Sequence, residues 1–304
     1  MAYETVTAVI LRLVEWSESS LVLTLFGRES GKLYAVAKGA RRPKAPFDAS
    51  LDFLACCRMT LIRKTSDALN LATESKLIRW FRLPPDLRRW YAGFYIAELL
   101  DAMTETELPI PELFDLTEET LAAFSGGVWN DPAPPVDVVS IVGPAATALM
   151  VTRWELVAMR LLGLFPDPDG CSECGEEVIE RGRVSFHFPD GLLCPRCRAA
   201  RRNRAGICSH AGDAGISGGV GFTISIAEST FRFMQRLADP HITLDSFFAA
   251  NSFHGVPPVI PTELRIILNQ WIADQLGRIP RTATYLPDVV GPLHRVRRHV
   301  AVPL

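Results

Sequence analysis

Residues 171–197 read CSECGEEVIERGRVSFHFPDGLLCPRC, and this stretch fixes one module of the fold. Its four cysteines form two pairs with two residues inside each pair: Cys171, Cys174, Cys194 and Cys197. Two such pairs separated by roughly 15–20 residues are typical of a structural zinc site. Each short spacing lets one turn direct two sulfurs at the same point, and Zn²⁺ accepts four thiolates tetrahedrally with no position left for a substrate. We therefore predict a structural Zn²⁺ site.

The residues between the two cysteine pairs favour a zinc ribbon. Residues 183–188 read as a strand, and Pro189-Asp-Gly191 reads as a turn that reverses the chain. Two alternatives stay open: a disulfide pairing of the four cysteines, and replacement of one ligand by Cys208 or His210. We assign the ribbon to residues 171–200.

Helical patterns flank the ribbon on both sides. Asp86 is placed to cap a helix in which apolar residues recur at helical spacing from Leu87 onward. Similar patterns predict further helices at residues 112–124, 145–164, 226–237, 244–253 and 263–276. We assign a helical domain to residues 81–170 and 222–304, and a flexible Arg- and Gly-rich segment to residues 201–221.

The first 80 residues contain short β-prone runs instead of helical patterns. Five runs alternate with turn residues: 4–16, 21–26, 33–37, 53–63 and 68–75. Short strands at regular spacing predict a small barrel, and a five-stranded barrel of this size is an OB-fold candidate. Strand count alone does not separate it from an SH3-like barrel. The predicted fold class is thus α+β and multidomain, with a barrel at residues 1–80, a helical domain and an inserted four-cysteine ribbon.

Composition bounds the class of protein. The chain has 304 residues, of which 48% are hydrophobic and 22% are charged, as in ordinary globular proteins. The sequence contains neither an uninterrupted apolar run of about 20 residues nor a secretory pattern at its start. Because four of the 7 cysteines have metal-ligand spacing, we expect a reducing compartment, hence the cytoplasm, and no membrane partner.

Charge is distributed unevenly along the chain. Residues 1–92 contain 15 Lys and Arg against 9 Asp and Glu, whereas residues 93–170 contain 2 against 13. Residues 171–304 contain 15 against 12. A basic first segment and an acidic middle segment predict different partners for the two. The first suits a polyanion such as DNA, and the second suits a scaffold or a protein contact.

The strongest binding signal is a basic loop at residues 38–44, Lys-Gly-Ala-Arg-Arg-Pro-Lys. Its cations, Lys38, Arg41, Arg42 and Lys44, follow a predicted strand and can contact phosphates without reading bases. In an OB barrel, such a loop flanks the face that binds single strands. Further candidates are Lys32, Arg12 and Arg28. A solvated loop without a ligand is the alternative interpretation.

Motifs of catalysis are missing from the sequence. It contains no phosphate-binding loop, no dinucleotide fingerprint, no zinc-protease helix and no nucleophile elbow. We therefore expect no catalytic residues and no enzyme activity. Two other interpretations remain: a zinc-stabilised enzyme acting on nucleic acid, and an interaction scaffold without DNA affinity.

The order of these parts resembles the RecO family of bacterial DNA repair and recombination mediators. The resemblance is carried by Ala8-Val-Ile-Leu-Arg12, Gly31-Lys-Leu33, Val36-Ala-Lys-Gly-Ala-Arg-Arg42, Tyr95-Ile-Ala-Glu-Leu99, and Leu162-Gly-Leu-Phe-Pro-Asp167 leading into the first cysteine pair. Two departures stand out. The Gly-rich segment after the second cysteine pair is longer than in the family pattern, and the tail beyond Leu286 contains no family motif.

The resemblance implies a function. A RecO-like protein binds single- and double-stranded DNA through its OB barrel and anneals complementary strands, including strands coated with single-stranded-DNA-binding protein. With RecR it helps load the RecA recombinase, and it makes or breaks no bond. The resemblance also implies a structural zinc and a cytoplasmic, nucleoid-associated location. Arg153 and Arg160 lie on an otherwise apolar helix, where an acidic partner tail or buried ion pairs would explain them.

Overall fold

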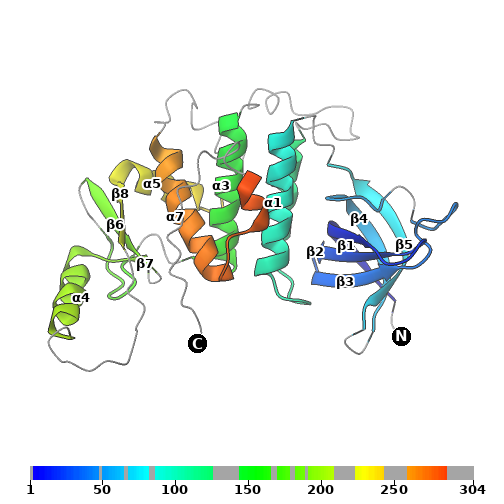
Figure 1. Cartoon of the computed structure of the whole chain (residues 1–304), viewed down its shortest axis with the longest axis horizontal. Coiled ribbons are helices and arrows are strands. Elements are labelled where there is room, and N and C mark those ends of the chain that lie inside the picture. The colour runs from blue at the N-terminus through cyan, green and yellow to red at the C-terminus, as the bar shows by residue number, and fades with distance from the viewer. Residues whose placement is uncertain are drawn as a thin grey trace. The chain divides into compact units, whose positions relative to one another are not determined.

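A computed structural model describes residues 3–47, 50–64, 68–81, 86–125, 144–165, 170–178, 182–188, 191–208, 223–242 and 259–285 (Figure 1). The chain divides into two compact units. The first comprises residues 1–154 and 280–290, and the second comprises residues 155–279 and 291–304. The finer four-part division predicted from the sequence stays a prediction.

The first unit begins with five strands that close into a barrel. They are β1 (Tyr3–Glu15), β2 (Leu21–Gly27), β3 (Gly31–Ala37), β4 (Cys56–Ile62) and β5 (Asn70–Arg79). The strand order around the barrel is β1-β2-β3-β5-β4, and only the β3–β5 pair is parallel. This is the strand order of an OB-fold, so the predicted OB barrel is confirmed. The open choice between an OB and an SH3-like barrel is thereby resolved.

Alternation along the strands fills the barrel interior. Residues at every second position point inward, as period-2 patterning requires. The interior includes fully buried side chains from four of the strands, such as Ile10, Leu25, Leu33 and Met59. In β1 the register shifts between Ile10 and Arg12, which marks a bulge. The bulge changes which residues of the second half of β1 face outward.

Two long helices, one short helix and the first part of α3 (Pro144–Leu161) make up the other described elements of the first unit. Helix α1 spans Leu87–Met103, and the Asp86 side chain accepts a hydrogen bond of 3.0 Å from the Arg88 N–H, which confirms the predicted cap. Helix α2 spans Pro111–Phe124 and begins with proline at its first position. The 3₁₀ helix η3 spans Arg281–Tyr285, and its first N–H groups donate to the Glu98 carboxylate of α1.

The helices cover one end of the barrel, and Gly31 lies where the segment between α1 and α2 approaches it closely. Its φ of 68° lies in the left-handed region that favours glycine. A Cβ atom at this position would lie 2.3 Å from the Leu108 carbonyl oxygen. The neighbouring Lys32 carbonyl accepts a 2.9 Å hydrogen bond from the Glu107 N–H. The segment between α1 and α2 therefore runs directly against the β2–β3 turn.

The second unit contains a three-stranded antiparallel sheet of order β7-β6-β8. Its strands are β6 (Arg183–His187), β7 (Gly191–Leu192) and β8 (Thr223–Ala227). The helices α4 (Pro195–Cys208), α5 (Glu228–Leu237) and α7 (Val259–Leu276) belong to this unit, and α3 (Pro144–Leu161) contributes its second half. Inside it, Arg265 forms a buried pair with Glu155 through two contacts of 2.7 Å.

The structure differs from two of the sequence expectations in this unit. Residues 223–227 form β8, whereas the sequence pattern places a helix start at Ile226. Residues 201–208 continue helix α4, whereas the sequence pattern predicts a flexible segment from residue 201. Arg and Ala are good helix formers, which explains the continuation. The predicted helix at 244–253 lies outside the described residues.

Within the described residues, the helices are too short or too polar for a transmembrane span.

Candidate functional site

The outward face of β1, β2 and β3 consists of three rows of side chains. From the end covered by helices, they are Phe26 with Lys32; Arg12 with Thr24 and Tyr34; and Val14 with Val22 and Val36. The first row is closed, because Phe26 packs against Phe114 with ring centroids 6.2 Å apart. The third row is open, and Val14 is 39% exposed. One end of this face is therefore available to a ligand.

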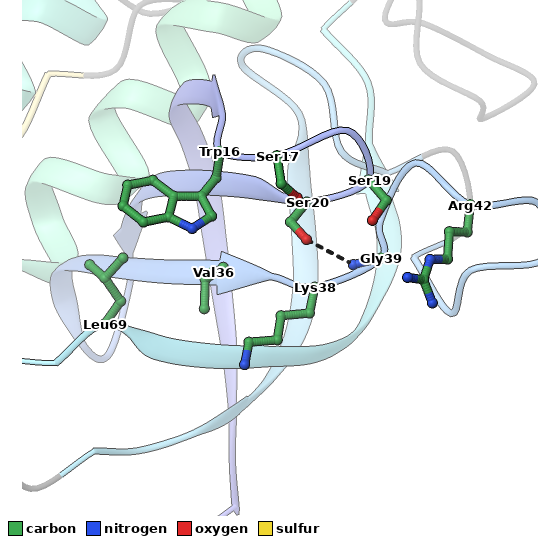
Figure 2. A pocket seen from close by; sticks show the side chains of 9 residues that line it. All are labelled: Trp16, Ser17, Ser19, Ser20, Val36, Lys38, Gly39, Arg42 and Leu69. Atoms are coloured by element: carbon green, nitrogen blue, oxygen red, sulfur yellow. Dashed lines mark hydrogen bonds between the residues drawn. The ribbon is translucent and has the colours of Figure 1, made fainter.

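A pocket of about 680 Å³ lies at the open end of this face (Figure 2). The β1–β2 loop contributes Trp16, Ser17, Ser19 and Ser20. Strand β3 and the residues after it contribute Val36, Lys38, Gly39 and Arg42, and Leu69 precedes β5. In OB-folds, the face of strands 2 and 3 and the loops after strands 1 and 4 bind oligonucleotides. The pocket occupies that position.

Trp16 is the most exposed side chain with a large apolar area in this pocket. Its side chain is 71% accessible, and Leu69 is 37% accessible. Figure 2 shows the indole beside Leu69, with Lys38 and Arg42 on the same pocket. The site thus combines an exposed aromatic plane, aliphatic side chains and two cations.

The basic loop is built from two successive turns. Gly39 has a φ of 70°, and its carbonyl accepts a 3.0 Å hydrogen bond from the Arg42 N–H. The Arg42 carbonyl then accepts a 3.2 Å bond from the Ala45 N–H. Lys38, Arg41, Arg42 and Lys44 are all exposed. The structure therefore gathers the four loop cations predicted from the sequence at one edge of the barrel.

Three contacts attach the basic loop to the β1–β2 loop and to the last residue of β1. The Gly39 N–H donates to the Ser20 hydroxyl at 3.3 Å, and the Arg41 N–H donates to the Ser19 carbonyl at 3.1 Å. The Arg41 guanidinium pairs with the Glu15 carboxylate at 2.9 Å. The two loops consequently form one surface, with Arg41 held by an acidic neighbour.

The remaining predicted cations lie elsewhere on the barrel. Lys32 is buried and donates to the Asp101 carbonyl at 2.5 Å. Arg28 forms a bidentate pair with Asp115 at 2.8 and 2.9 Å, and this contact raises the pKa of the guanidinium. Both residues attach the helices to the barrel and are distant in register from the basic loop. Arg12 is exposed on the middle row, one row from the pocket.

The four cysteines converge in the second unit. Their sulfur atoms all lie within 4.8 Å of one another, and those of Cys174 and Cys194 are 3.8 Å apart. A tetrahedron with Zn–S bonds of about 2.3 Å has edges of about 3.8 Å. The cysteines are free thiols, so the alternative disulfide pairing is not formed. The arrangement is compatible with a structural zinc.

Local hydrogen bonding favours ionised sulfur at Cys171, whereas the side-chain hydrogen bond with Cys194 raises the pKa of the Cys197 thiol. Burial opposes ionisation of Cys171, but backbone N–H groups, first that of Cys194, outweigh it and lower the pKa of the thiol to about 6. The thiolate is the form that binds a metal. Gly175, with a φ of 71°, closes the first turn through a 2.8 Å bond from its N–H to the Cys171 carbonyl. The side chains of Cys208 and His210 lie outside the described residues.

The two arginines of α3 are not arranged for a partner tail. Arg153 is 2% exposed, and Arg160 donates to the Ala238 carbonyl at 3.1 Å. Burial of Arg153 and the part-buried hydrogen bond of Arg160 therefore set the environments of these two side chains.

Sequence reasoning missed the apolar half of the barrel site. Trp16, Val36 and Leu69 come from three separate segments, and only the barrel closure brings them together. One signal was available: Trp16 stands in the otherwise polar run Glu15-Trp-Ser-Glu-Ser-Ser20 between two strands. A tryptophan in a short polar loop is rarely needed for packing.

Comparisons with known proteins agree with this architecture. Residues 1–81 match the family model described as "Recombination protein O N terminal", and residues 84–142 match "Recombination protein O C terminal". A DNA repair protein RecO of Rhodopirellula baltica is 34% identical over 94% of this chain and 100% of its own length. That of Anaeromyxobacter sp. strain K is 32% identical over 94% and 96%. The Salinibacter ruber protein is 41% identical over 49% of this chain and 59% of its own.

Proposed function

Because this chain belongs to the RecO family of DNA repair proteins, we propose that its barrel binds DNA and that it acts as a non-enzymatic strand-annealing mediator. The observation that carries the proposal is the basic loop beside an open pocket on the OB binding face. Lys38, Arg41, Arg42 and Lys44 are the proposed phosphate contacts, with Arg12 as a peripheral one. Lys32 and Arg28 are left out, since their side chains hold the helices against the barrel.

Charge neutralisation accounts for annealing without chemistry. Two DNA strands repel each other, and lysine and arginine side chains replace their condensed counterions on binding. Base pairing between the strands then supplies all sequence recognition, so the protein needs to hold phosphates and leave bases accessible. The exposed basic loop fits that requirement, and no catalytic residue is needed.

The proposed cellular role follows the family. The protein would act with RecR and with single-stranded-DNA-binding protein to help load RecA in the cytoplasm, at the nucleoid. The acidic segment of residues 93–170 suits scaffold or protein contacts better than DNA. Zn²⁺ at the four cysteines would stabilise the second unit and take no part in strand exchange.

Binding titrations with single- and double-stranded DNA at several salt concentrations test the proposal. We expect Lys38→Ala with Arg42→Ala to weaken binding and to reduce the salt slope on single strands by about 0.7 for each lost phosphate contact. The matched control is Lys76→Ala, which removes an exposed charge that pairs with Glu74 on β5. It should leave the slope unchanged.

Three outcomes would contradict the proposal. If the purified chain has no DNA affinity, the protein is an interaction scaffold. If it cleaves or modifies DNA, it is a nucleic-acid enzyme. If the double variant and Lys76→Ala behave alike, DNA binds elsewhere on the chain.

A further inference from the structure

We propose that the pocket beside the basic loop is a base-binding site, in which Trp16 stacks on one unpaired base of a single strand. This inference rests on the proposed function and adds to it a contact with bases. It also adds a preference for single-stranded over double-stranded DNA.

The exposure of Trp16 has no explanation in packing. The indole is 71% accessible, although it sits at the end of a strand that contributes many buried residues. Single exposed apolar residues are ordinary, but contiguous ones mark binding sites. Here Val14 and Leu69 are also more than a third exposed, and Leu69 and Val36 line the same pocket as Trp16. The exposed apolar surface is therefore continuous.

The chemistry of the pocket matches a nucleotide. Its volume of about 680 Å³ falls within the range of about 300–1,000 Å³ usual for small-molecule sites. A nucleotide has a flat apolar ring and a charged phosphate. Trp16 offers the flat surface, and Lys38 and Arg42 line the same pocket as cations.

The serines of the pocket favour tolerance of base identity. Ser17, Ser19 and Ser20 come from the β1–β2 loop, and a hydroxyl can either donate or accept a hydrogen bond. The Ser20 hydroxyl already accepts the Gly39 N–H, which fixes the pocket wall. Stacking itself is tolerant, because every base has a π face. A protein that anneals arbitrary sequences needs such tolerance.

A duplex cannot use this pocket. Its bases are stacked and paired, so only the phosphates would reach the basic loop, while an unpaired strand would engage both the cations and the indole. The site thus makes the protein prefer single strands. A bound base dissociates from the pocket when it pairs with a complementary strand. Release on pairing suits an annealing protein, because the product is bound less tightly than the substrate.

The test compares two strands of equal charge and two proteins. A short oligothymidylate and an abasic strand of the same length are titrated with the wild-type chain and with Trp16→Ala. We expect the wild type to bind the thymidylate strand more tightly by roughly 5- to 150-fold, the range that stacking of one base supports. Trp16→Ala should lose that advantage and bind both strands alike, with an unchanged salt slope. Trp16→Phe should retain most of the advantage.

The matched control is Tyr3→Ala, at the opposite end of β1. Tyr3 is 72% exposed, so the substitution removes an equally accessible aromatic ring that lies outside the pocket. The preference of this variant for the thymidylate strand should persist. Equal binding of both strands by the wild type, or equal loss on both strands in Trp16→Ala, would overturn the base-binding site while leaving the phosphate contacts intact. Absence of wild-type binding to either strand would instead overturn the proposed function beneath it.

Discussion

Replacing Glu15 with glutamine should strengthen DNA binding, because Glu15 competes with phosphate for Arg41. The Glu15 side chain is 72% exposed and the Arg41 side chain 46%, and a guanidinium nitrogen of Arg41 lies 2.9 Å from a carboxylate oxygen of Glu15. Ion pairs so accessible are worth about 0.2–1 kcal/mol. Releasing Arg41 should therefore raise affinity for a single strand by about 1.4- to 5-fold at low salt, and screening should reduce the gain at high salt.

Fluorescence anisotropy with a labelled oligothymidylate measures this gain, and Glu18→Gln is the matched control. Glu18 lies three residues after Glu15, in the β1–β2 loop; it carries the same charge and makes no ion pair within the described residues. A double-mutant cycle then isolates the Arg41 contribution: in an Arg41→Ala background, Glu15→Gln should give only the effect of Glu18→Gln. If the two glutamine variants are equal in the wild-type background as well, a general charge effect replaces the competition and the reasoning fails.

Three further predictions concern stability and metal. Gly31→Ala should lower the free energy of unfolding by about 2–4 kcal/mol in urea titrations, since the added Cβ would meet Leu108. The control is Gly163→Ala, at a φ of 67° in open space, which should lower it by about 1 kcal/mol. Equal losses of stability in the two variants would contradict the close approach of Leu108 to Gly31. Glu155→Gln should lower the free energy of unfolding by about 3–5 kcal/mol, because it leaves the Arg265 guanidinium buried without its carboxylate partner. Replacing both residues with methionine should restore most of this stability. Unchanged stability of Glu155→Gln would refute the prediction. Elemental analysis should find one zinc per chain. Removing the metal with a chelator should lower the melting temperature of the second unit without changing DNA affinity. A metal-free protein that is fully stable with all four thiols free would overturn the zinc assignment.

Local patterns were sufficient for most of the fold. Period-2 alternation and turn residues predicted the five barrel strands, and cysteine spacing predicted the converging sulfurs, because both features depend on neighbours in sequence. Strand β8 was missed for the opposite reason. Thr223–Ala227 is a short run that leads straight into α5 with no intervening turn, and it becomes a strand only by pairing with β6.

The candidate site was predictable only in its charged half. The basic loop is contiguous in sequence, whereas Trp16, Val36 and Leu69 meet through barrel closure. The bulge near Ile10 also decides which residues of β1 face outward, and no sequence pattern locates it. Lys32 and Arg28 looked like equivalent cations, but their roles depend on helices that follow some 70 and 87 residues later.

Photo-crosslinking tests most directly where the strand lies. A single strand containing 5-iododeoxyuridine is bound to the wild-type chain and irradiated, and the crosslinked peptides are identified by mass spectrometry. The account predicts crosslinks at Trp16 and in the basic loop, and their loss in Trp16→Ala with Lys38→Ala and Arg42→Ala. Crosslinks confined to the second unit, with none on the barrel, would contradict it.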